Sequence, residues 1–384
     1  MDNLTHSLVG LAAAKAGLER LSPGATAVCV LAANAPDLDI LATLGGKWFY
    51  LQHHRGITHS IVGTLTLALL IPALFYAGDL ILARIRRRGR RVRFNGLLLA
   101  SLVLSASHPL LDWMNNYGVR PFLPWNGEWF YGDLVFIVDP WLWLLIGGAA
   151  FLLTSQRTWQ ITLWSILAIV LTGLVIFLPL ENAGLLHSNI FRVLWIAALF
   201  GLFLARRAKL NVRWGKSVAI VAFLLVTVYW GGLAILHGVA VSKSEIIARR
   251  LSSQKTEKLL RLATMPLLAD PFRWQCVAET DRATYRFNVS VMQGNEVSGE
   301  VIRIEKPQDE EALALGQASK DERAKIFLDF ARFPVARIRG DCLSGLLVQF
   351  ADLRYTEPNA NARGTFSLNV PVGCTAETGK VTGK

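Results

Sequence analysis

Histidines are concentrated near the start of this sequence. Five of the seven fall within the first 108 residues, beside aspartates or helix-breaking turns, in a segment that otherwise reads as membrane. Imidazoles mixed with carboxylates are the ligand set of zinc, manganese and iron sites. Ionisable groups are costly inside a bilayer and usually mark function. The pattern therefore predicts a metal site built into a membrane protein.

Two aspartates interrupt an apolar stretch early in the sequence. Asp37 and Asp39 follow Pro36 and are separated by one leucine. Two carboxylates this close at membrane depth repel one another unless a cation or a proton lies between them. A helix cap is the structural alternative, because proline breaks what precedes it and aspartate is favoured at N-caps. His6, near the start of the chain, adds an imidazole to the same region.

Two further motifs combine histidines with charged neighbours. The run His53–His59 contains Gly56 and forms a turn leading into an apolar stretch; a helix N-terminus there would also favour anions such as phosphate. Arg55 would then be a partner for an oxyanion or a phosphate group. His108 and Asp112 are four residues apart, so on a helix they share one face and could clamp one ion. A plain histidine–aspartate hydrogen bond is the alternative for that pair.

The composition is that of a membrane protein. Hydrophobic residues make up 53% of the sequence and charged residues 18%, against roughly 25% charged in average soluble proteins. A stretch of about 20 mostly apolar residues can span a bilayer as a helix. A shorter apolar helix is expected around Ser7–Gly17. The stretches predicted to span the membrane are Ala25–Leu44, Ile61–Leu82, Leu97–Leu111, Leu134–Leu153, Ile161–Leu180, Leu185–Ala205 and Val218–Val241.

Basic residues explain the net charge of +12 and orient these spans. They cluster in two loops, Arg84–Arg93 and Arg206–Lys216, and the positive-inside rule places such loops in the cytoplasm. A nucleic-acid partner is therefore not expected. Threading the spans between the loops brings the candidate ligands to the outer side of the membrane. His6 joins them if the N-terminus is outside or if the first helix is short and re-entrant.

The C-terminal third of the sequence has a different pattern. Thr284–Val291, Glu300–Ile304 and Leu346–Tyr355 alternate with the period of two expected of strands with one buried face. Asp321–Phe333 has helical spacing of its apolar residues, and Met265–Trp274 reads as a proline-punctuated linker. These patterns predict a soluble α+β domain. The threaded topology places that domain outside the cytoplasm.

Cysteine usage is compatible with that placement. Cys276, Cys342 and Cys374 lie in the C-terminal domain and Cys29 lies in a predicted span. In an oxidising compartment, the three C-terminal cysteines allow one disulfide and leave one thiol over. The sequence has no CxxC or Cys/His zinc spacing, no Walker loop and no GxSxG. Hydrolytic chemistry would therefore depend on the histidine and aspartate motifs.

The histidine and aspartate motifs resemble a known family. The sequence is similar to the YdjM/YfhP-type family over roughly residues 1–150, in the runs Asn34–Asp39, His54–Ser60 and His108–Asp112. Members of that family are described as membrane-bound metal-dependent hydrolases, and some are LexA-regulated. A distant kinship with zinc-dependent phospholipase C further implies phosphoester chemistry.

The resemblance also implies the ligands and the metal. The ion would be zinc, with manganese as the alternative, in one or two copies, and Asp37 or Asp39 would bridge two ions. Structural zinc sites are usually closed by four protein ligands, so a larger candidate set argues for more than one ion or for open positions. The metal-site positions are His6, Asp37, Asp39, His54, His59, His108 and Asp112.

The predicted function is that of a metal-dependent hydrolase acting on a lipid or lipid-linked phosphoester at the outer membrane face. Bound metal would lower the pKa of a coordinated water toward neutrality. Arg55 and Thr58 are predicted to orient the anionic group of the substrate, and Asp139 to act as general base or to support a histidine. The alternatives are a metal-ion transporter and a non-catalytic, metal-stabilised membrane scaffold.

The predicted fold class is mainly α: a polytopic α-helical membrane domain with a C-terminal extracytoplasmic α+β domain. Residues 1–150 would form the membrane-embedded hydrolase core, 151–245 additional transmembrane helices, and 246–384 the soluble domain. The expected location is the inner membrane of a bacterial cell, where the partners would be the lipid bilayer and a phosphoester substrate.

Overall fold

The chain folds into two compact units that alternate along the sequence. The computed structural model describes residues 1–177, 185–340, 345–359 and 364–373. The helical unit comprises Met1–Leu38, Arg55–Ile235 and Pro266–Pro271, and the mixed unit comprises Asp39–His54, Leu236–Met265 and Phe272–Lys384.

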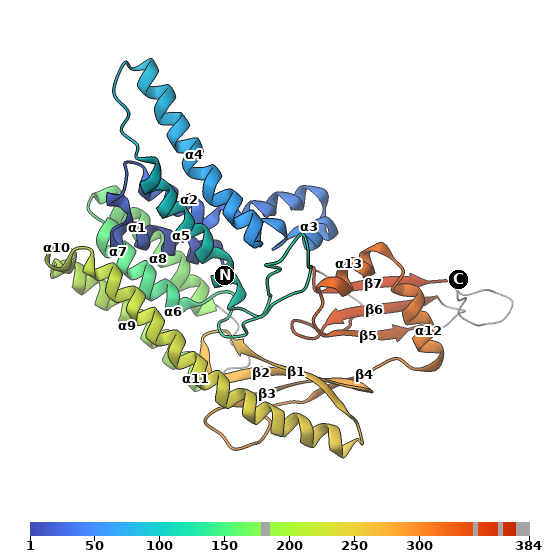
Figure 1. The fold of residues 1–384 in the computed structure, drawn as a ribbon. Coiled ribbons are helices and arrows are strands. Elements are labelled where there is room, and N and C mark those ends of the chain that lie inside the picture. The colour runs from blue at the N-terminus through green and yellow to red at the C-terminus, as the bar shows by residue number, and fades with distance from the viewer. Residues whose placement is uncertain (178–184, 341–344, 360–363, 374–384) are drawn as a thin grey trace. The chain divides into compact units, whose positions relative to one another are not determined.

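Helices build the helical unit (Figure 1). The short helices are α1 (Asn3–Ala16), α2 (Ala25–Asn34), α6 (Pro140–Leu142), α7 (Gly148–Thr154) and α10 (Leu210–Trp214). The long helices are α4 (Ile61–Ile85), α5 (Phe94–Trp113), α8 (Thr158–Phe177), α9 (Leu185–Arg207) and α11 (Ser217–Gln254), the last of which continues into the mixed unit.

Six helical segments of the described chain are long and apolar enough to cross a membrane. The mainly helical membrane fold is therefore as the composition predicts. The predicted span Leu134–Leu153 is wrong in its first part, because its helix begins only at Pro140. Asp139 ends the preceding non-helical stretch: its side chain caps α6 by accepting hydrogen bonds from the backbone N–H groups of Trp141 and Leu142 at 2.9 and 3.4 Å.

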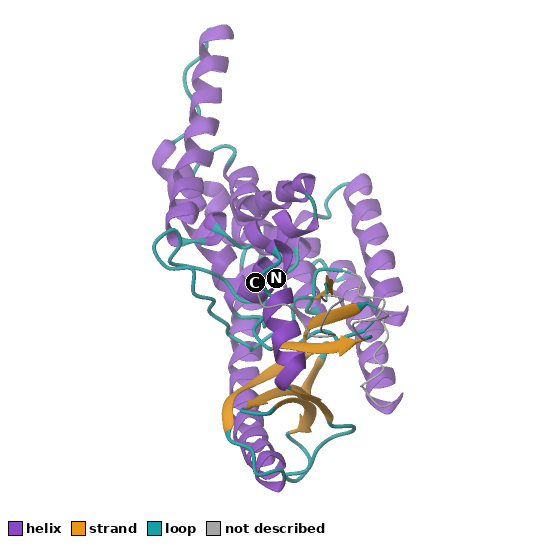
Figure 2. Ribbon diagram, turned by 90° about the vertical axis from the view of Figure 1, so that its right-hand side faces the viewer, coloured by secondary structure: helices purple, strands orange, loops and turns teal. Residues whose placement is uncertain are grey.

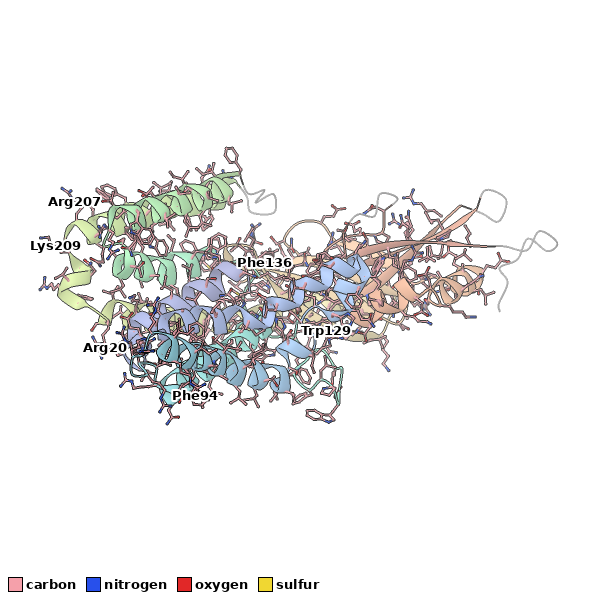
Figure 3. All side chains as sticks on the ribbon, turned by 90° about the horizontal axis from the view of Figure 1, so that it is seen from above. Arg20, Phe94, Trp129, Phe136, Arg207 and Lys209 are labelled. Atoms are coloured by element: carbon pink, nitrogen blue, oxygen red, sulfur yellow. The ribbon has the colours of Figure 1, made fainter. Side chains whose placement is uncertain are left out.

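Basic residues gather at one end of the helical unit. Arg20, Arg207 and Lys209 lie together at that end, whereas Trp129 and Phe136 lie further along the unit, away from it (Figure 3). The predicted topology requires the basic loops to lie at the same end of the helical unit, as these three residues do. We call this end the basic end.

Close packing of small residues joins α1 to α2. Gly10 on α1 faces the backbone of α2, and a Cβ atom on Gly10 would lie 2.8 Å from the carbonyl oxygen of Cys29. Small residues commonly let helices approach this closely in membranes. The contact fixes α1, which carries His6, against α2, which leads into Asp37.

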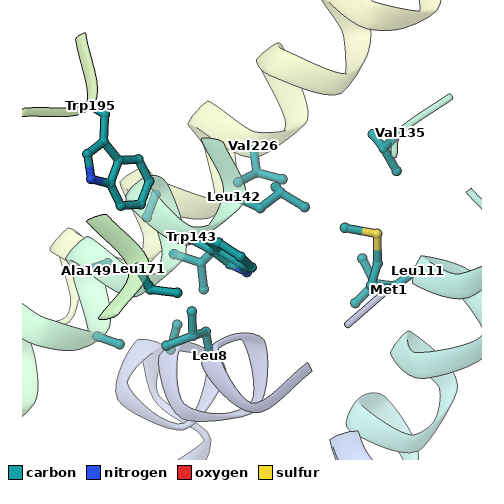
Figure 4. Packing of buried hydrophobic residues seen from close by; sticks show 14 of the residues in the cluster. Met1, Leu8, Leu111, Val135, Leu142, Trp143, Ala149, Leu171, Trp195 and Val226 are labelled. Carbon is teal, nitrogen blue, oxygen red and sulfur yellow. The ribbon is translucent and has the colours of Figure 1, made fainter. Parts of the chain in front are cut away.

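A larger apolar core lies between α1 and the later helices. Leu8, Trp143, Leu171 and Trp195 are buried together in it (Figure 4). The indole N–H of Trp143 donates to the hydroxyl of Thr5 at 3.2 Å, so the only polar atom of that ring is satisfied within the core. The region from Trp143 to Gly147 is a π-helical turn between α6 and α7.

The mixed unit has two antiparallel sheets, with strand orders β1-β2-β3-β4 and β5-β6-β7 (strands orange in Figure 2). Its elements are α3 (Lys47–His53), β1 (Leu259–Leu267), β2 (Asp270–Thr280), β3 (Ala283–Ser290), β4 (Ile302–Glu305), α12 (Asp309–Ala318), α13 (Glu322–Phe330), β5 (Pro334–Arg339), β6 (Leu346–Asp352) and β7 (Ser367–Val372).

The C-terminal α+β region follows the predicted strand pattern with one correction. Met265–Trp274 is not a linker, because it forms the end of β1, a turn and the start of β2. Proline is tolerated on edge strands, which need fewer N–H donors, and β1 is the edge strand of its sheet. Pro266 therefore lies on the edge strand of the sheet, and Pro271 lies at the start of β2.

The described cysteines do not test the predicted disulfide. Cys29 and Cys276 are buried and unpaired among the described residues. Cys342 and Cys374 lie outside the described residues.

Candidate metal centre

A tight turn places His59 at the start of α4. Residues Ile57–His59 form one 3₁₀ turn, and the Ser60 hydroxyl then caps α4 by accepting a hydrogen bond from the Gly63 N–H at 3.1 Å. A Cβ atom on Gly63 would lie 1.8 Å from the Ile57 carbonyl oxygen, so only glycine fits this turn. The turn leaves His59 buried inside the helical unit.

His108 and Asp112 share one buried face near the end of α5. His108 Nδ1 lies 2.6 Å from the carbonyl oxygen of Ala33. Because that oxygen can only accept, Nδ1 carries the hydrogen, and Nε2 of the neutral ring presents its lone pair. Asp37 lies in the 3₁₀ segment Ala35–Gly45 that follows α2. One stretch of chain thus orients His108 and also supplies a carboxylate beside it.

Four ligand atoms converge in the helical unit. His59 Nε2 lies 3.1 Å from His108 Nε2, 3.4 Å from Asp37 Oδ1 and 3.2 Å from Asp112 Oδ2. His108 Nε2 lies 3.5 and 3.4 Å from the same two carboxylate oxygens. All four atoms lie within 4.8 Å of one another. This buried group, the four-ligand cluster, could hold a metal ion.

The spacing and chemistry of the four-ligand cluster suit a small divalent cation. Zinc takes nitrogen and oxygen ligands at about 2.0–2.2 Å, so four tetrahedral ligands lie about 3.3–3.6 Å apart. Two carboxylates buried beside each other are unfavourable without a cation or a proton. Oδ2 of Asp37 and Oδ2 of Asp112 have no hydrogen-bond partner among the described residues. The cluster therefore fits a cation better than it fits a hydrogen-bonded network.

His6 lies against the four-ligand cluster without being one of its members. Its ring stacks on the ring of His108 with centroids 3.7 Å apart, and its Nε2 lies 3.4 Å from Asp112 Oδ1. Neither ring nitrogen has a hydrogen-bond partner among the described residues. Burial is the largest cause that holds the pKa of His6 well below its ordinary value. The ring is therefore a neutral imidazole beside the candidate metal.

Arg55 holds Asp112 in place. Its Nη2 donates to Asp112 Oδ1 at 3.0 Å, and its Nη1 donates to Asn115 Oδ1 at 3.0 Å and to the Gly118 carbonyl oxygen at 3.1 Å. The guanidinium also lies 4.7 Å from the centroid of the Tyr117 ring. The amino group at the start of the chain contacts the same Asp112 oxygen. Asp112 thus presents Oδ2 to the cluster while Oδ1 is held by the Arg55 guanidinium and the amino group.

Thr58 orients His59. The hydroxyl oxygen of Thr58 lies 3.1 Å from His59 Nδ1. Contacts of this kind to the second ring nitrogen fix the orientation of metal-binding histidines. The predicted action of Thr58 and Arg55 on the substrate stays a prediction; each of the two residues contacts one cluster member, His59 and Asp112 respectively.

Comparison with known proteins agrees with the motifs. Residues 1–183 match the model of the family described as YdjM inner membrane protein. Over this region, just under half of the chain, the sequence is similar to the YdjM/YfhP-type family. The chain is also 29% identical over 154 residues to the uncharacterized protein YfhP of Bacillus subtilis (strain 168). That match covers 38% of this chain and 43% of the relative, and no solved structure matches the chain.

Two predicted ligands have other partners. Asp39 and His54 both belong to the mixed unit, and His54 Nδ1 lies 3.1 Å from Asp39 Oδ1. Neither is a member of the four-ligand cluster. That Asp37 or Asp39 bridges two ions stays a prediction, and of the two only Asp37 is a member of the cluster.

Asp139 has structural contacts rather than contacts to the cluster. Its Oδ1 caps α6, and its Oδ2 accepts a hydrogen bond from the hydroxyl of Tyr229 at 3.0 Å. Burial raises the pKa of Asp139 to about 6 even though these hydrogen bonds oppose the shift. Its predicted role as general base is not supported by a contact to a cluster member among the described residues.

The sequence interpretation missed three supporting groups. They are the Ala33 carbonyl, which accepts a hydrogen bond from His108; Asn115, which accepts one from Arg55; and Tyr229, which donates one to Asp139. A backbone carbonyl leaves no sequence signal. Tyr229 offered one, since its hydroxyl lies in an otherwise apolar span and a buried hydroxyl needs a partner.

Proposed function

We propose that this protein is a membrane-bound metal-dependent hydrolase of a lipid or lipid-linked phosphoester. The observation that carries the proposal is the four-ligand cluster, with two histidine nitrogens and two carboxylate oxygens around one point, beside the unpartnered imidazole of His6. The ligands Asp37, His59, His108 and Asp112 would hold the ion. Bound there, it would supply an activated water and a positive charge for the developing anion.

Zinc suits the ligand set better than manganese does. Neutral imidazoles and a tetrahedral spacing favour zinc, whereas manganese prefers octahedral sites rich in oxygen. The two imidazoles in the cluster, His59 and His108, are the ligands that favour zinc over manganese. We therefore propose one zinc ion in the four-ligand cluster, where the activated water would be a fifth ligand.

The residues around the cluster would accept a proton, position the ligands and leave a path for the substrate. His6 would accept the proton of the attacking water, because both of its ring nitrogens are free among the described residues and it lies 3.4 Å from the ligand Asp112. Arg55 would position Asp112, and Thr58 would position His59. Asp37 is the ligand with the largest side-chain exposure, 11%, so the substrate would approach from its side.

The position of the cluster supports a lipid-linked substrate. His59 and Asp112 lie at the ends of α4 and α5, both of which are candidate membrane spans. A site at the end of a span lies near the boundary of the hydrocarbon, where lipid headgroups are found. A phosphoester in or near a headgroup could therefore reach the ion without leaving the membrane.

The helices α4 and α5 also indicate on which side of the membrane the cluster lies. The basic run Arg84–Arg93 joins the end of α4 to the start of α5, so the cluster lies at the other ends of both helices. Basic loops stay in the cytoplasm. The family is one of inner membrane proteins, and we propose that the cluster and the C-terminal domain lie on the outer face of that membrane.

A reporter fused after Lys384 tests this topology. We expect a fusion active only outside the cytoplasm to work, and one active only in the cytoplasm to be silent, because α11 is the single span between the basic loop at Arg206–Lys216 and the mixed unit. As a control, each reporter is fused within Arg84–Arg93. There the cytoplasmic reporter should be active and the other one silent. A cytoplasmic reporter that is active at Lys384 would move the C-terminal domain to the inner face.

Hydrolysis is tested with purified, zinc-loaded protein and a panel of phosphoester lipids. We expect release of a phosphorylated headgroup or of phosphate, and we expect His6→Gln to lower the turnover about 10²–10⁴-fold, the usual contribution of a general base, without loss of metal. Asp139→Asn should change the turnover much less.

The controls separate catalysis from the two alternatives. Exposed His53→Ala should leave both turnover and metal content unchanged. A wild-type protein that holds zinc but cleaves none of the lipids, and that unfolds when zinc is removed, would contradict the proposal in favour of a scaffold. Zinc uptake by sealed vesicles in place of cleavage would contradict it in favour of a transporter.

A further inference from the structure

An apolar cavity lies in the helical unit away from the four-ligand cluster. It has a volume of about 240 Å³ and is lined by residues of α1, the π-helical turn, α7, α8 and α9, among them Leu8, Gly147, Trp164, Trp195 and Leu202. Part of this lining belongs to the core shown in Figure 4. Apart from the Ser165 hydroxyl, no polar side chain other than an indole lines it.

The indole groups around the cavity need no partner inside it. The N–H of Trp164 donates to the Thr154 hydroxyl at 2.9 Å, and the N–H of Trp195 donates to the Thr172 hydroxyl at 3.0 Å. The N–H of Trp143 donates to Thr5. The cavity therefore offers its occupant apolar contacts only, which suits a hydrocarbon chain.

Two glycines create this space. A Cβ atom on Gly148 would lie 2.8 Å from Leu202 Cδ2, and one on Gly147 would lie 3.2 Å from Leu8 Cδ1. The turn that carries Gly147 is π-helical, and such turns interrupt α-helices mainly at functional sites. Larger residues at these two positions would press on the walls of the cavity.

A second cavity adjoins the first and has a lysine and two glutamines in its otherwise largely apolar lining. It has a volume of about 480 Å³, it shares the wall residues Trp164 and Leu167 with the apolar cavity, and its lining includes Lys15, Gln156 and Gln160. These polar residues lie at the end of α1 and around the start of α8. That is the end of the unit at which the basic residues gather (Figure 3).

We propose that the two adjoining cavities form a phospholipid-binding site. One hydrocarbon chain would lie in the apolar cavity, and the phosphate would lie in the second cavity near Lys15. The ammonium of Lys15 is partly exposed and forms an ion pair with Glu19 at 2.6 Å. Exposed Arg157 follows Gln156 and adds positive charge at the same place. The ligand class is an anionic phospholipid of the leaflet at the basic end. This site does not depend on the proposed hydrolysis.

Lipid retention in native mass spectrometry tests the site. The full chain is purified in a mild detergent, exchanged into one containing phosphatidylglycerol, and analysed for bound lipid. We expect one tightly held lipid, and we expect Ala168→Trp, which fills the apolar cavity, to weaken binding more than about tenfold, since each methylene group that cannot be buried lowers affinity about fourfold. Lys15→Gln should reduce the preference for phosphatidylglycerol over phosphatidylcholine.

Matched variants decide the outcome. Ile169→Trp adds the same side chain at the next residue of α8, where it is exposed, and should retain the lipid. Unchanged zinc content in Ala168→Trp shows that the helical unit is folded. Equal lipid retention by folded Ala168→Trp and Ile169→Trp would overturn the proposal. Retention with no difference between the two headgroups in wild type would overturn the assignment of the phosphate to Lys15.

Discussion

Replacing His59 with alanine should abolish metal binding. His59 Nε2 lies 3.1 to 3.4 Å from the ligand atoms of all three other members of the cluster. Its loss leaves one imidazole and two carboxylates and opens one side of the site. Changes in the groups that merely support ligands cost about 10–100-fold in affinity, so we expect loss of a ligand to cost more than about 100-fold. Elemental mass spectrometry of the purified protein measures the result.

Three further variants calibrate this result. Asp112→Ala should behave like His59→Ala, whereas His53→Ala changes an exposed histidine whose Nδ1 contacts the Phe49 carbonyl oxygen and should keep the full metal content. Asp39→Ala should also keep it, because Asp39 is not a member of the cluster. Metal content that follows Asp39 and ignores His59 would show that the ion is held elsewhere.

Replacing Arg55 with methionine should destabilise the helical unit strongly. Arg55 and Asp112 are both buried, with side-chain exposures of 4% and 1%, and removing one partner of a buried ion pair costs about 3–5 kcal/mol. The variant also removes the donor to the Gly118 carbonyl and one of the two donors to Asn115 Oδ1, which keeps the Tyr117 N–H. Lysine at this position should rescue only part of the loss, since an ammonium cannot match the forked guanidinium contacts.

Thermal unfolding with and without zinc measures this effect. We expect zinc to restore part of the lost stability, because the ion itself neutralises Asp112 once it is bound. Arg249→Met is the control: its pair with Glu245 is exposed on α11, and such pairs contribute at most about 1 kcal/mol. Equal unfolding temperatures for Arg55→Met and Arg249→Met would contradict the assigned role of Arg55.

Part of the site could be predicted because local geometry decides it. His108 and Asp112 are four residues apart on a helix, so their common face follows from helical periodicity alone. The turn before α4 follows from Gly63, whose missing Cβ lets the chain pass the Ile57 carbonyl. The topology that put His59 at the same end followed from the basic loop between α4 and α5. The helical spacing, the turn and the basic loop each involve residues close together in the sequence, so the sequence alone can predict them.

The ligands that could not be predicted depend on details that composition does not specify. Asp37 and Asp39 look equivalent in the sequence, but they lie in a 3₁₀ segment with three residues per turn, so their side chains point about 120° apart. His54 likewise lies five residues before His59 and pairs with Asp39. Spacing alone could not show that Asp39 and His54 partner each other while Asp37 and His59 share the cluster.

Asp139 illustrates a second limit. A lone aspartate before an apolar helix is compatible with a cap and with a general base, and the capping hydrogen bonds from Trp141 and Leu142 and the bond from Tyr229 are seen only in three dimensions. The same is true of the cavities proposed to bind lipid. Their walls come from five elements, so no single stretch of sequence predicts the space between them.

The most direct test of the central claim is the position of the ion in an experimental structure of the zinc-loaded protein. Anomalous scattering at the zinc edge should show one strong peak about 2.0–2.2 Å from His59 Nε2, His108 Nε2 and a carboxylate oxygen of each aspartate, Asp37 and Asp112. A peak between His54 and Asp39, or no peak within reach of His59 and His108 in a protein shown to contain zinc, would contradict the four-ligand cluster as the metal centre.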